Sequence, residues 1–195
     1  MEKLEQSGKE ETVFQGQIFE VIKKLMKKGN KVVEFEIARR APGTRLIIIK
    51  NDKVLLSKEF RYELNDYDYR LPGGKVFDTL KEYKQAMTQS QDVLLRAKKA
   101  AEKECLEETG IVPKNINFFY LSHSGGPTVE WDLYYFIVDS FEENAGGQKL
   151  GLGEDIKTEW KTQKEIEELC VENKINEDRT VGVLFKFFRS KQNKN

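Results

Sequence analysis

The sequence predicts an α/β protein in which helices cover a mixed sheet. Short alternating or apolar runs, which are typical of strands, are interleaved along the chain with segments whose apolar residues recur at helical spacing. The run at residues 45–49 is apolar after its first residue, as expected for a strand at the centre of a sheet that is covered on both faces. With 195 residues, the chain can form one well-buried domain, which we place at residues 13–190.

The N-terminal residues are expected to extend this domain with antiparallel strands. The highly polar residues 1–12 predict a flexible end. Alternating apolar residues at 13–21 and 32–38 flank a basic turn that contains a Gly-Asn pair. Residues 13–40 therefore predict a hairpin.

The rest of the chain predicts a second hairpin, three further strands and four helices. The second hairpin is formed by residues 45–49 and 54–61, around Asn51-Asp52. The later elements are, in order, helices at 79–87 and 92–109, strands at 116–122, 131–138 and 156–160, and helices at 162–172 and 176–188. Thr162 and Glu165 predict a capping box. The last helix is expected to bury Val181, Leu184, Phe185 and Phe188, and to leave a flexible tail at 191–195.

Four carboxylates lie within seven positions of the predicted helix 92–109, namely Glu102, Glu104, Glu107 and Glu108. On a helix, Glu104 and Glu108 share a face, whereas Lys103 and Glu107 form an i,i+4 pair on a neighbouring face. Because like charges so close together repel, a cation is expected beside them. Glutamate oxygens without His or thiolate partners favour Mg²⁺ or Mn²⁺ over zinc. The alternative is an acidic, solvent-exposed helix end.

The residues before this helix complete a known motif. Tyr69 to Val76 predicts a strand that ends in the turn Gly73-Gly74, where backbone carbonyls can approach an ion. With the acidic helix, this order resembles the Nudix hydrolases, whose box runs Gly, five residues, Glu, seven residues, then Arg-Glu-apolar-any-Glu-Glu-any-Gly-apolar. Gly74 matches the opening glycine. Residues 103–111 match the closing nine, with Lys103 in place of Arg.

The spacing within the box departs from the family pattern. Gly74 and Lys103 are 29 positions apart, where the family has 14, so we expect an insertion of 15 residues at 79–93. Its helical spacing places Leu80, Tyr83 and Met87 on one stripe, which favours a packed extra helix over a cofactor site. The box glutamate expected eight positions before Lys103 is replaced by Leu95.

Outside the box, residues 13–188 resemble the ADP-ribose and ADP-sugar pyrophosphatases, over about nine tenths of the chain. The matching segments are 13–21, 42–43, 53–62 and 153–156. The resemblance implies a homodimer built through the N-terminal hairpin and an Mg²⁺-dependent hydrolase. Such an enzyme would cleave ADP-ribose or a nucleotide sugar to a nucleoside monophosphate and a sugar phosphate. Two alternatives remain: hydrolysis of nucleoside triphosphates or dinucleoside polyphosphates, and a non-catalytic nucleotide sensor.

The resemblance also implies roles for ten residues. The metal ligands would be the carbonyl of Gly73 together with Glu104 and Glu108. Glu107 would be either a further ligand or only the salt-bridge partner of Lys103. Glu154, in a Gly-rich loop, would be the general base, with Asp155 as the alternative. Substrate contacts would come from Arg61, Arg70, Gly74 and Glu130. Arg70 stands where the subgroup has an acidic residue before Leu-Pro.

Charge and composition narrow the expected partners. The formal net charge is +0, so no global field would attract nucleic acid or a membrane surface, and a small-molecule nucleotide is expected instead. The sequence contains no run of 18 apolar residues, and its N-terminus is polar. We therefore expect a cytoplasmic protein. Cys105 and Cys170 are too few for a disulfide framework and are expected to be buried.

Overall fold

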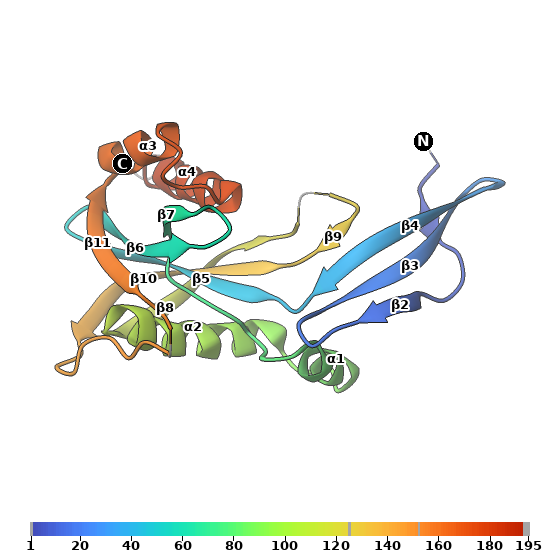
Figure 1. Cartoon of the computed structure of the whole chain (residues 1–195), viewed down its shortest axis with the longest axis horizontal. Coiled ribbons are helices and arrows are strands. Elements are labelled where there is room, and N and C mark those ends of the chain that lie inside the picture. The colour runs from blue at the N-terminus through green and yellow to red at the C-terminus, as the bar shows by residue number, and fades with distance from the viewer. Residues whose placement is uncertain (1, 125, 152, 193–195) are drawn as a thin grey trace.

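The computed structural model describes residues 2–124, 126–151 and 153–192 (Figure 1). These residues form two sheets and four helices. The strands are β1 (Glu5–Gln6), β2 (Glu11–Gln15), β3 (Phe19–Lys28), β4 (Lys31–Arg40), β5 (Gly43–Lys50), β6 (Lys53–Arg61), β7 (Asp66–Arg70), β8 (Ile111–Ser122), β9 (Val129–Glu130), β10 (Leu133–Glu143) and β11 (Ile156–Thr162). The helices are α1 (Leu80–Thr88), α2 (Val93–Thr109), α3 (Gln163–Val171) and α4 (Asp178–Gln192).

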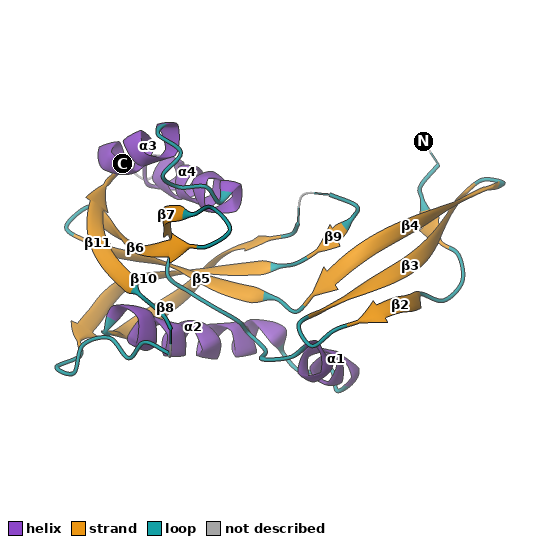
Figure 2. Ribbon diagram, viewed as in Figure 1, coloured by secondary structure: helices purple, strands orange, loops and turns teal. Residues whose placement is uncertain are grey.

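The central sheet has the strand order β11-β6-β5-β10-β8, and β7 pairs with β6. Strand β5 runs parallel to β10, whereas the other neighbouring strands are antiparallel, so the sheet is mixed as predicted. Helix α2 covers one face, and helices α3 and α4 cover the other (Figure 2). The result is the predicted α/β/α sandwich.

Strand β5 shows why the sheet is covered on both sides. Successive side chains of a strand point to opposite faces. Leu46 and Ile48 pack into the core beneath α2, and Ile47 between them packs into the core formed with α3 and α4. All three side chains are fully buried. The apolar run predicted to lie at the sheet centre therefore does so.

Helix α2 has the predicted bounds because both of its ends are capped. The Asp92 side chain accepts a hydrogen bond of 3.1 Å from the backbone N–H of Leu95. Gly110 ends the helix in the left-handed conformation, with φ at 68°. Small side chains at i, i+4 and i+8 allow close packing on the sheet, and they are Ala97, Ala101 and Cys105. Cys105 is thus buried as expected, whereas Cys170 is only partly buried.

Strands β1 to β4 and β9 form a separate sheet that protrudes from the central domain (Figure 1). The β3–β4 hairpin turns at Gly29 and confirms the predicted antiparallel extension. The predicted single strand at 13–21 is wrong, because the Gly16 N–H bonds to the Phe19 carbonyl over 2.9 Å and a turn separates β2 from β3. Pairing with β3 also makes strands of residues 5–6 and 11–12, where the sequence predicted a flexible end.

The segment predicted as an insertion contains α1, whose first turn is capped by the Thr79 side chain. Leu80 is buried as predicted, but Met87 is 53% exposed, and Ala86 is buried instead. The backbone N–H of Leu80 donates to the carbonyl of Gln17 over 2.9 Å. Helix α1 is thereby attached to the protruding sheet.

The C-terminal helices cover the second face of the central sheet. The capping box of Thr162 and Glu165 is present at the start of α3, as predicted. Helix α4 buries Val183, Leu184 and Phe187, so the prediction that Phe185 is buried is wrong; its side chain is 66% exposed. Residues 191–192 continue α4 instead of starting a tail, and 193–195 lie outside the described residues.

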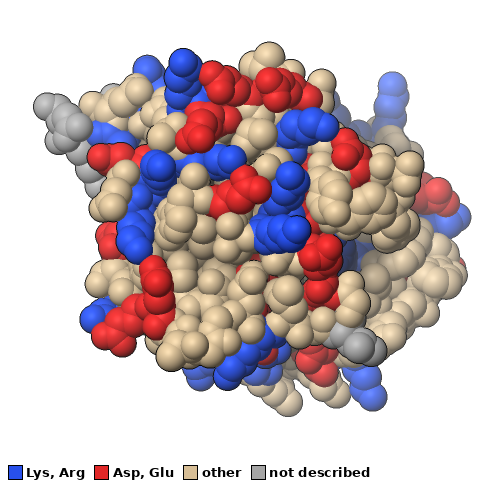
Figure 3. Space-filling model, turned by 60° about the vertical axis from the view of Figure 1, so that its left-hand side comes forward, with Lys and Arg blue, Asp and Glu red and all other residues tan. Residues whose placement is uncertain are grey.

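The surface of the molecule reflects its balanced charge. Acidic and basic side chains are interspersed over the face that Figure 3 shows, in keeping with the formal net charge of +0. No helix of the described chain is long and apolar enough to cross a membrane.

Candidate active site

A cavity of about 980 Å³ lies beside α2, the Gly-Gly turn, the end of β6 and the loop before β11. Nine of the ten residues with predicted roles line it: Arg61, Arg70, Gly73, Gly74, Lys103, Glu104, Glu107, Glu108 and Glu154. These residues come from segments that are up to 93 positions apart in the sequence. The fold therefore brings together the groups that the motif suggested.

The two glycines allow the turn to run directly against α2. Gly73 has φ at 145°, and a Cβ there would overlap the backbone of Thr44 and Arg45. A Cβ on Gly74 would collide with the carboxylate of Glu104. The backbone N–H of Gly73 also donates to Oε2 of Glu108 over 2.8 Å. Gly73 is thus required by its close approach to the β5 backbone, and Gly74 by its close approach to the carboxylate of Glu104.

The carboxylates of Glu104 and Glu108 lie in an environment that disfavours their charges. The pKa of Glu108 is raised to about 7, mainly by burial and also by the charge of the neighbouring Glu104, against the opposing effect of the Gly73 N–H. The pKa of Glu104 is also raised, first by burial and then by the charge of Glu107. This crowding of acids is the electrostatic pattern that a bound cation would relieve.

The donor set fits a hard divalent cation by its chemistry, because it consists of carboxylate oxygens. Within the described ranges, no three His, Cys, Asp or Glu side chains are close enough together to hold a metal ion. Mg²⁺ in phosphoryl-transfer sites commonly uses one or two carboxylates and completes its shell with water and substrate phosphates. Glu104 and Glu108 match that pattern. Glu107 is 3.4 Å from the ammonium of Lys103, an ion pair that was anticipated from the sequence.

The sequence interpretation missed Arg45, which lines the same cavity. Arg45 is buried on β5, donates to the carbonyl of Thr44 over 3.0 Å and lies 3.7 Å from Glu177. Its positive charge acts to lower the pKa of both Glu104 and Glu108. A single charged residue beside an otherwise apolar strand was the signal that could have identified it.

Arg61 and Arg70 reach the cavity from neighbouring strands, β6 and β7. Arg61 pairs with Glu59 at 3.3 Å, and Arg70 pairs with the buried Asp68 at 2.5 Å. The Nε atoms of Arg61 and Arg45 are buried and have no hydrogen-bond partner among the described residues. Buried donors without partners are uncommon in folded proteins, and here they concentrate positive charge behind the wall of the cavity.

Glu154 lies in the loop between β10 and β11, which is attached to the C-terminal end of α2. The backbone N–H of Lys149 donates to the carbonyl of Glu107 over 2.8 Å, and the Gln148 side chain donates to the carbonyl of Glu108. Glu154 itself accepts a hydrogen bond of 2.8 Å from the Gly151 N–H. Its charge acts to raise the pKa of Glu108, so the two carboxylates are within electrostatic reach. Asp155 does not line the cavity.

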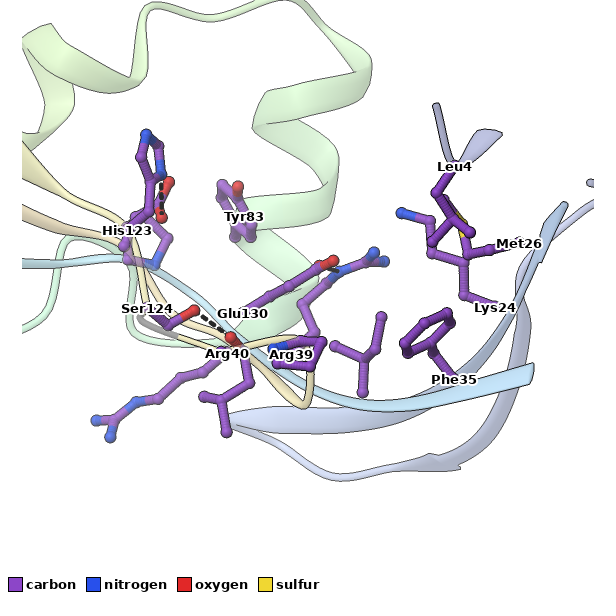
Figure 4. A pocket seen from close by; sticks show the side chains of 16 residues that line it. Leu4, Lys24, Met26, Phe35, Arg39, Arg40, Tyr83, His123, Ser124 and Glu130 are labelled. Atoms are coloured by element: carbon purple, nitrogen blue, oxygen red, sulfur yellow. Dashed lines mark hydrogen bonds and ion pairs between the residues drawn. The ribbon is translucent and has the colours of Figure 1, made fainter. Parts of the chain in front are cut away.

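Glu130 is the predicted site residue that lies elsewhere. It lines a neighbouring cavity of about 490 Å³, together with Arg39, Tyr83 and His123 (Figure 4). The carboxylate of Glu130 accepts a hydrogen bond of 2.6 Å from Nε of Arg39 on β4. Arg40 lines both cavities, so they are adjacent. Glu130 thus belongs to the junction between the two sheets and not to the acidic cavity.

Comparison with known proteins finds a match among solved structures. No protein-family model matches the sequence, and no curated protein matches it. Among solved structures, the crystal structure of an ADP compounds hydrolase is similar, with a TM-score of 0.74 and 16% sequence identity. The match covers 98% of this chain and 96% of that chain. At this identity the likeness concerns the fold alone, and it confirms the predicted α/β class.

Proposed function

We propose, from a fold shared over nearly its whole length with an ADP compounds hydrolase, that this chain is a Nudix hydrolase of nucleoside diphosphate compounds. Its substrate would be a nucleoside diphosphate linked to another group, such as ADP-ribose or a nucleotide sugar. Hydrolysis of the diphosphate would yield a nucleoside monophosphate and a sugar phosphate. Mg²⁺, or Mn²⁺ in its place, would be required.

The observation that carries this proposal is the convergence of carboxylates and arginines in one cavity. The Gly-Gly turn, Glu104 and Glu108 lie at its acidic side, and Arg45, Arg61 and Arg70 also line it. A diphosphate needs both a cation for its charged oxygens and hydrogen-bond donors that fix its position. Arginine forks suit this second task, because they donate two parallel hydrogen bonds to phosphate.

Each residue would contribute a separate part of the reaction. Glu104 and Glu108 would hold the divalent ion, which neutralises phosphoryl oxygens and makes a bound water more acidic. Arg61 would orient the diphosphate through its guanidinium, and Arg70 could do so in competition with Asp68. Arg45 would limit the mutual repulsion of the two glutamates while no ion is bound. Glu154 would accept the proton of the attacking water.

The proposal is tested by incubating the purified protein with Mg²⁺ and a panel of ADP-ribose, nucleotide sugars, nucleoside triphosphates and dinucleoside polyphosphates. Phosphorylated products are measured by chromatography. We expect turnover of a diphosphate compound, its loss in Glu108→Gln, and no activity with a chelator present. Preferential turnover of triphosphates or polyphosphates would replace the substrate assignment. Nucleotide binding without turnover of any compound would overturn the hydrolase proposal in favour of a sensor.

We also propose that the protruding sheet forms a homodimer. Apolar side chains that are 39–54% exposed gather on it: Leu4, Val13, Phe14, Ile18, Phe19, Leu25, Val32 and Val33. Exposed apolar groups in such number favour an interaction surface. The sheet also borders both cavities, since Ile18 and Arg40 line the acidic one. A second copy of the chain is the partner that this arrangement suits.

A further inference from the structure

Helix α2 carries a row of basic residues ahead of its acidic end. Arg96, Lys99 and Lys103 are spaced three and four positions apart, and all three line the 980 Å³ cavity. Such spacing places them along one face of the helix. Glu104, Glu107 and Glu108 follow toward the C-terminal end of the helix and line the same cavity. The wall of the cavity is therefore divided lengthwise into a basic part and an acidic part.

The charges of the basic part are available to a ligand. Arg96 and Lys99 are exposed, and neither forms an ion pair within the described part of the chain. Lys75, next to the Gly-Gly turn, also lines the cavity without such a partner in that part. Asp78 and Glu82 also line the cavity, and Glu82 accepts a hydrogen bond of 3.3 Å from the backbone N–H of Asp78. Among the residues that the structure describes, neither acid forms an ion pair with Arg96 or Lys99.

Arg96 is held in place by an aromatic ring. Its guanidinium lies 5.5 Å from the centroid of Phe77. Phe77 is 4% exposed and packs with Ala41 and Ala86 in the small core beneath α1. The guanidinium is thus partly ordered before any ligand binds, which reduces the entropy cost of forming a phosphate contact.

The distance along the helix separates this basic row from the reaction centre. At a rise of about 1.5 Å per residue, Arg96 lies roughly 12 Å from Glu104 along the helix axis. A diphosphate bound at the acidic end is too short to contact both groups. A phosphate that reaches Arg96 must therefore belong to a different part of the substrate, whereas Lys103, which pairs with Glu107, lies at the acidic end.

From this arrangement we infer that the substrate carries a further phosphate monoester, distant from the diphosphate that is cleaved, and that Arg96 and Lys99 bind it. This inference rests on the proposed function and adds the substrate class: a nucleoside diphosphate compound phosphorylated on its sugar. Arg96 supplies a planar fork for the monoester, and Lys99 supplies a second positive charge.

The test compares ADP-ribose with its 2′-phosphate and 3′-phosphate forms. Binding of each is measured by calorimetry on Glu108→Gln, and turnover is measured on the wild-type chain. We expect one phosphorylated form to bind roughly tenfold more tightly, and to have a similarly higher kcat/KM, than ADP-ribose. The double variant Arg96→Gln with Lys99→Gln should remove that preference and leave ADP-ribose almost unaffected.

Lys98→Gln is the matched control, because Lys98 lies on α2 between these two residues and does not line the cavity. It should retain the preference. Equal binding of all three compounds, or an equal loss for all three in the double variant, overturns the inference even if hydrolysis occurs. Absence of turnover with a preserved binding preference would instead count against the proposed hydrolase alone.

Discussion

The backbone N–H of Gly73 donates a hydrogen bond of 2.8 Å to Oε2 of Glu108, a residue 35 positions further along the chain. This bond joins the turn after β7 to the last turn of α2. It leaves the other oxygen of Glu108 available to a ligand, since a carboxylate has acceptor sites on both oxygens. The geometry of the candidate metal site therefore depends on the backbone of the turn as much as on the glutamates.

The metal-free protein should become less stable as the pH rises from about 5 to 8. The pKa of Glu108 is about 7 in the folded chain and 4.5 without its surroundings. Between these values the folded chain keeps a proton that the unfolded chain has lost, so the free energy of unfolding falls with rising pH. The difference amounts to about 2–3 kcal/mol for one such group. Denaturant melts at several pH values, with a chelator present, measure it.

Glu108→Gln removes this titration and supplies the comparison. Its amide oxygen can still accept from the Gly73 N–H, so the variant should fold. Above pH 7 it should be more stable than the metal-free wild type, and the gap should close near pH 5. Added Mg²⁺ should stabilise only the wild type. Parallel stability curves for the two proteins would refute the predicted burial of a titrating Glu108.

Gly74→Ala should impair catalysis without unfolding the protein. The new methyl group would meet the carboxylate of Glu104, which would have to move from its present position. Displacement of one ligand should lower kcat/KM roughly tenfold or more. Gly182→Ala is the control, because a Cβ there has no heavy atom within 4 Å and α4 favours alanine. The control should keep full activity and gain roughly 0.5–1 kcal/mol of stability.

Glu154→Gln should lower kcat and leave KM nearly unchanged. If Glu154 accepts a proton from the attacking water, its loss should reduce kcat roughly 10²–10⁴-fold. Asp155→Asn is the matched control, because Asp155 adjoins Glu154 but does not line the cavity. Initial-rate kinetics separate kcat from KM. An equal effect of the two substitutions would show that the loop as a whole, and not Glu154, matters for the reaction.

Lys84→Met should destabilise the junction between α1 and the protruding sheet. Lys84 pairs with Glu20, whose side chain is fully buried and otherwise has Arg39 at 3.6 Å. Removing one partner leaves a buried carboxylate less compensated, which should cost about 2 kcal/mol of unfolding free energy. Hydrogen exchange should rise in β3. Lys81→Met, on the same helix, is the control. It should change the unfolding free energy by no more than about 0.5 kcal/mol and leave hydrogen exchange in β3 unchanged.

Leu25→Asp should give a monomer if the protruding sheet forms the dimer. Leu25 lies on β3 and is 39% exposed, so a buried aspartate at a dimer interface would be strongly unfavourable. Light scattering after gel filtration gives the mass of each variant. Val171→Asp, at an 83% exposed position on α3, should retain the wild-type mass. A dimer that persists in Leu25→Asp would exclude this part of the sheet as the interface.

The sequence predicted best those elements whose signals are local. Helix α2 has the bounds predicted for it, because Asp92 and Gly110 cap its ends and capping depends on neighbouring backbone groups. The capping box at Thr162 was likewise found. Phe185 was assigned to the wrong face because helical spacing alone does not define which stripe meets the sheet, and the buried stripe is that of Val183 and Phe187.

The candidate site was predictable where a motif spans it and not where the fold alone brings residues together. Glu104 and Glu108 follow from spacing on one helix. Arg45 reaches the same cavity from β5 through tertiary packing, and its only local signal is a charge at the start of an apolar run. Glu130 was assigned to the substrate from its loop, but pairing of β9 with β4 places it beside Arg39.

Helix α1 makes the chain mechanically stiffer than its elongated shape suggests. A rotation of the protruding sheet away from α1 would break the bond between Leu80 and Gln17 and separate Lys84 from Glu20. These contacts stiffen the connection between α1 and the protruding sheet. Phe77 packs against Ala86 of α1, and its ring lies 5.5 Å from the guanidinium of Arg96, so α1 also connects the protruding sheet to the rim of the candidate cavity.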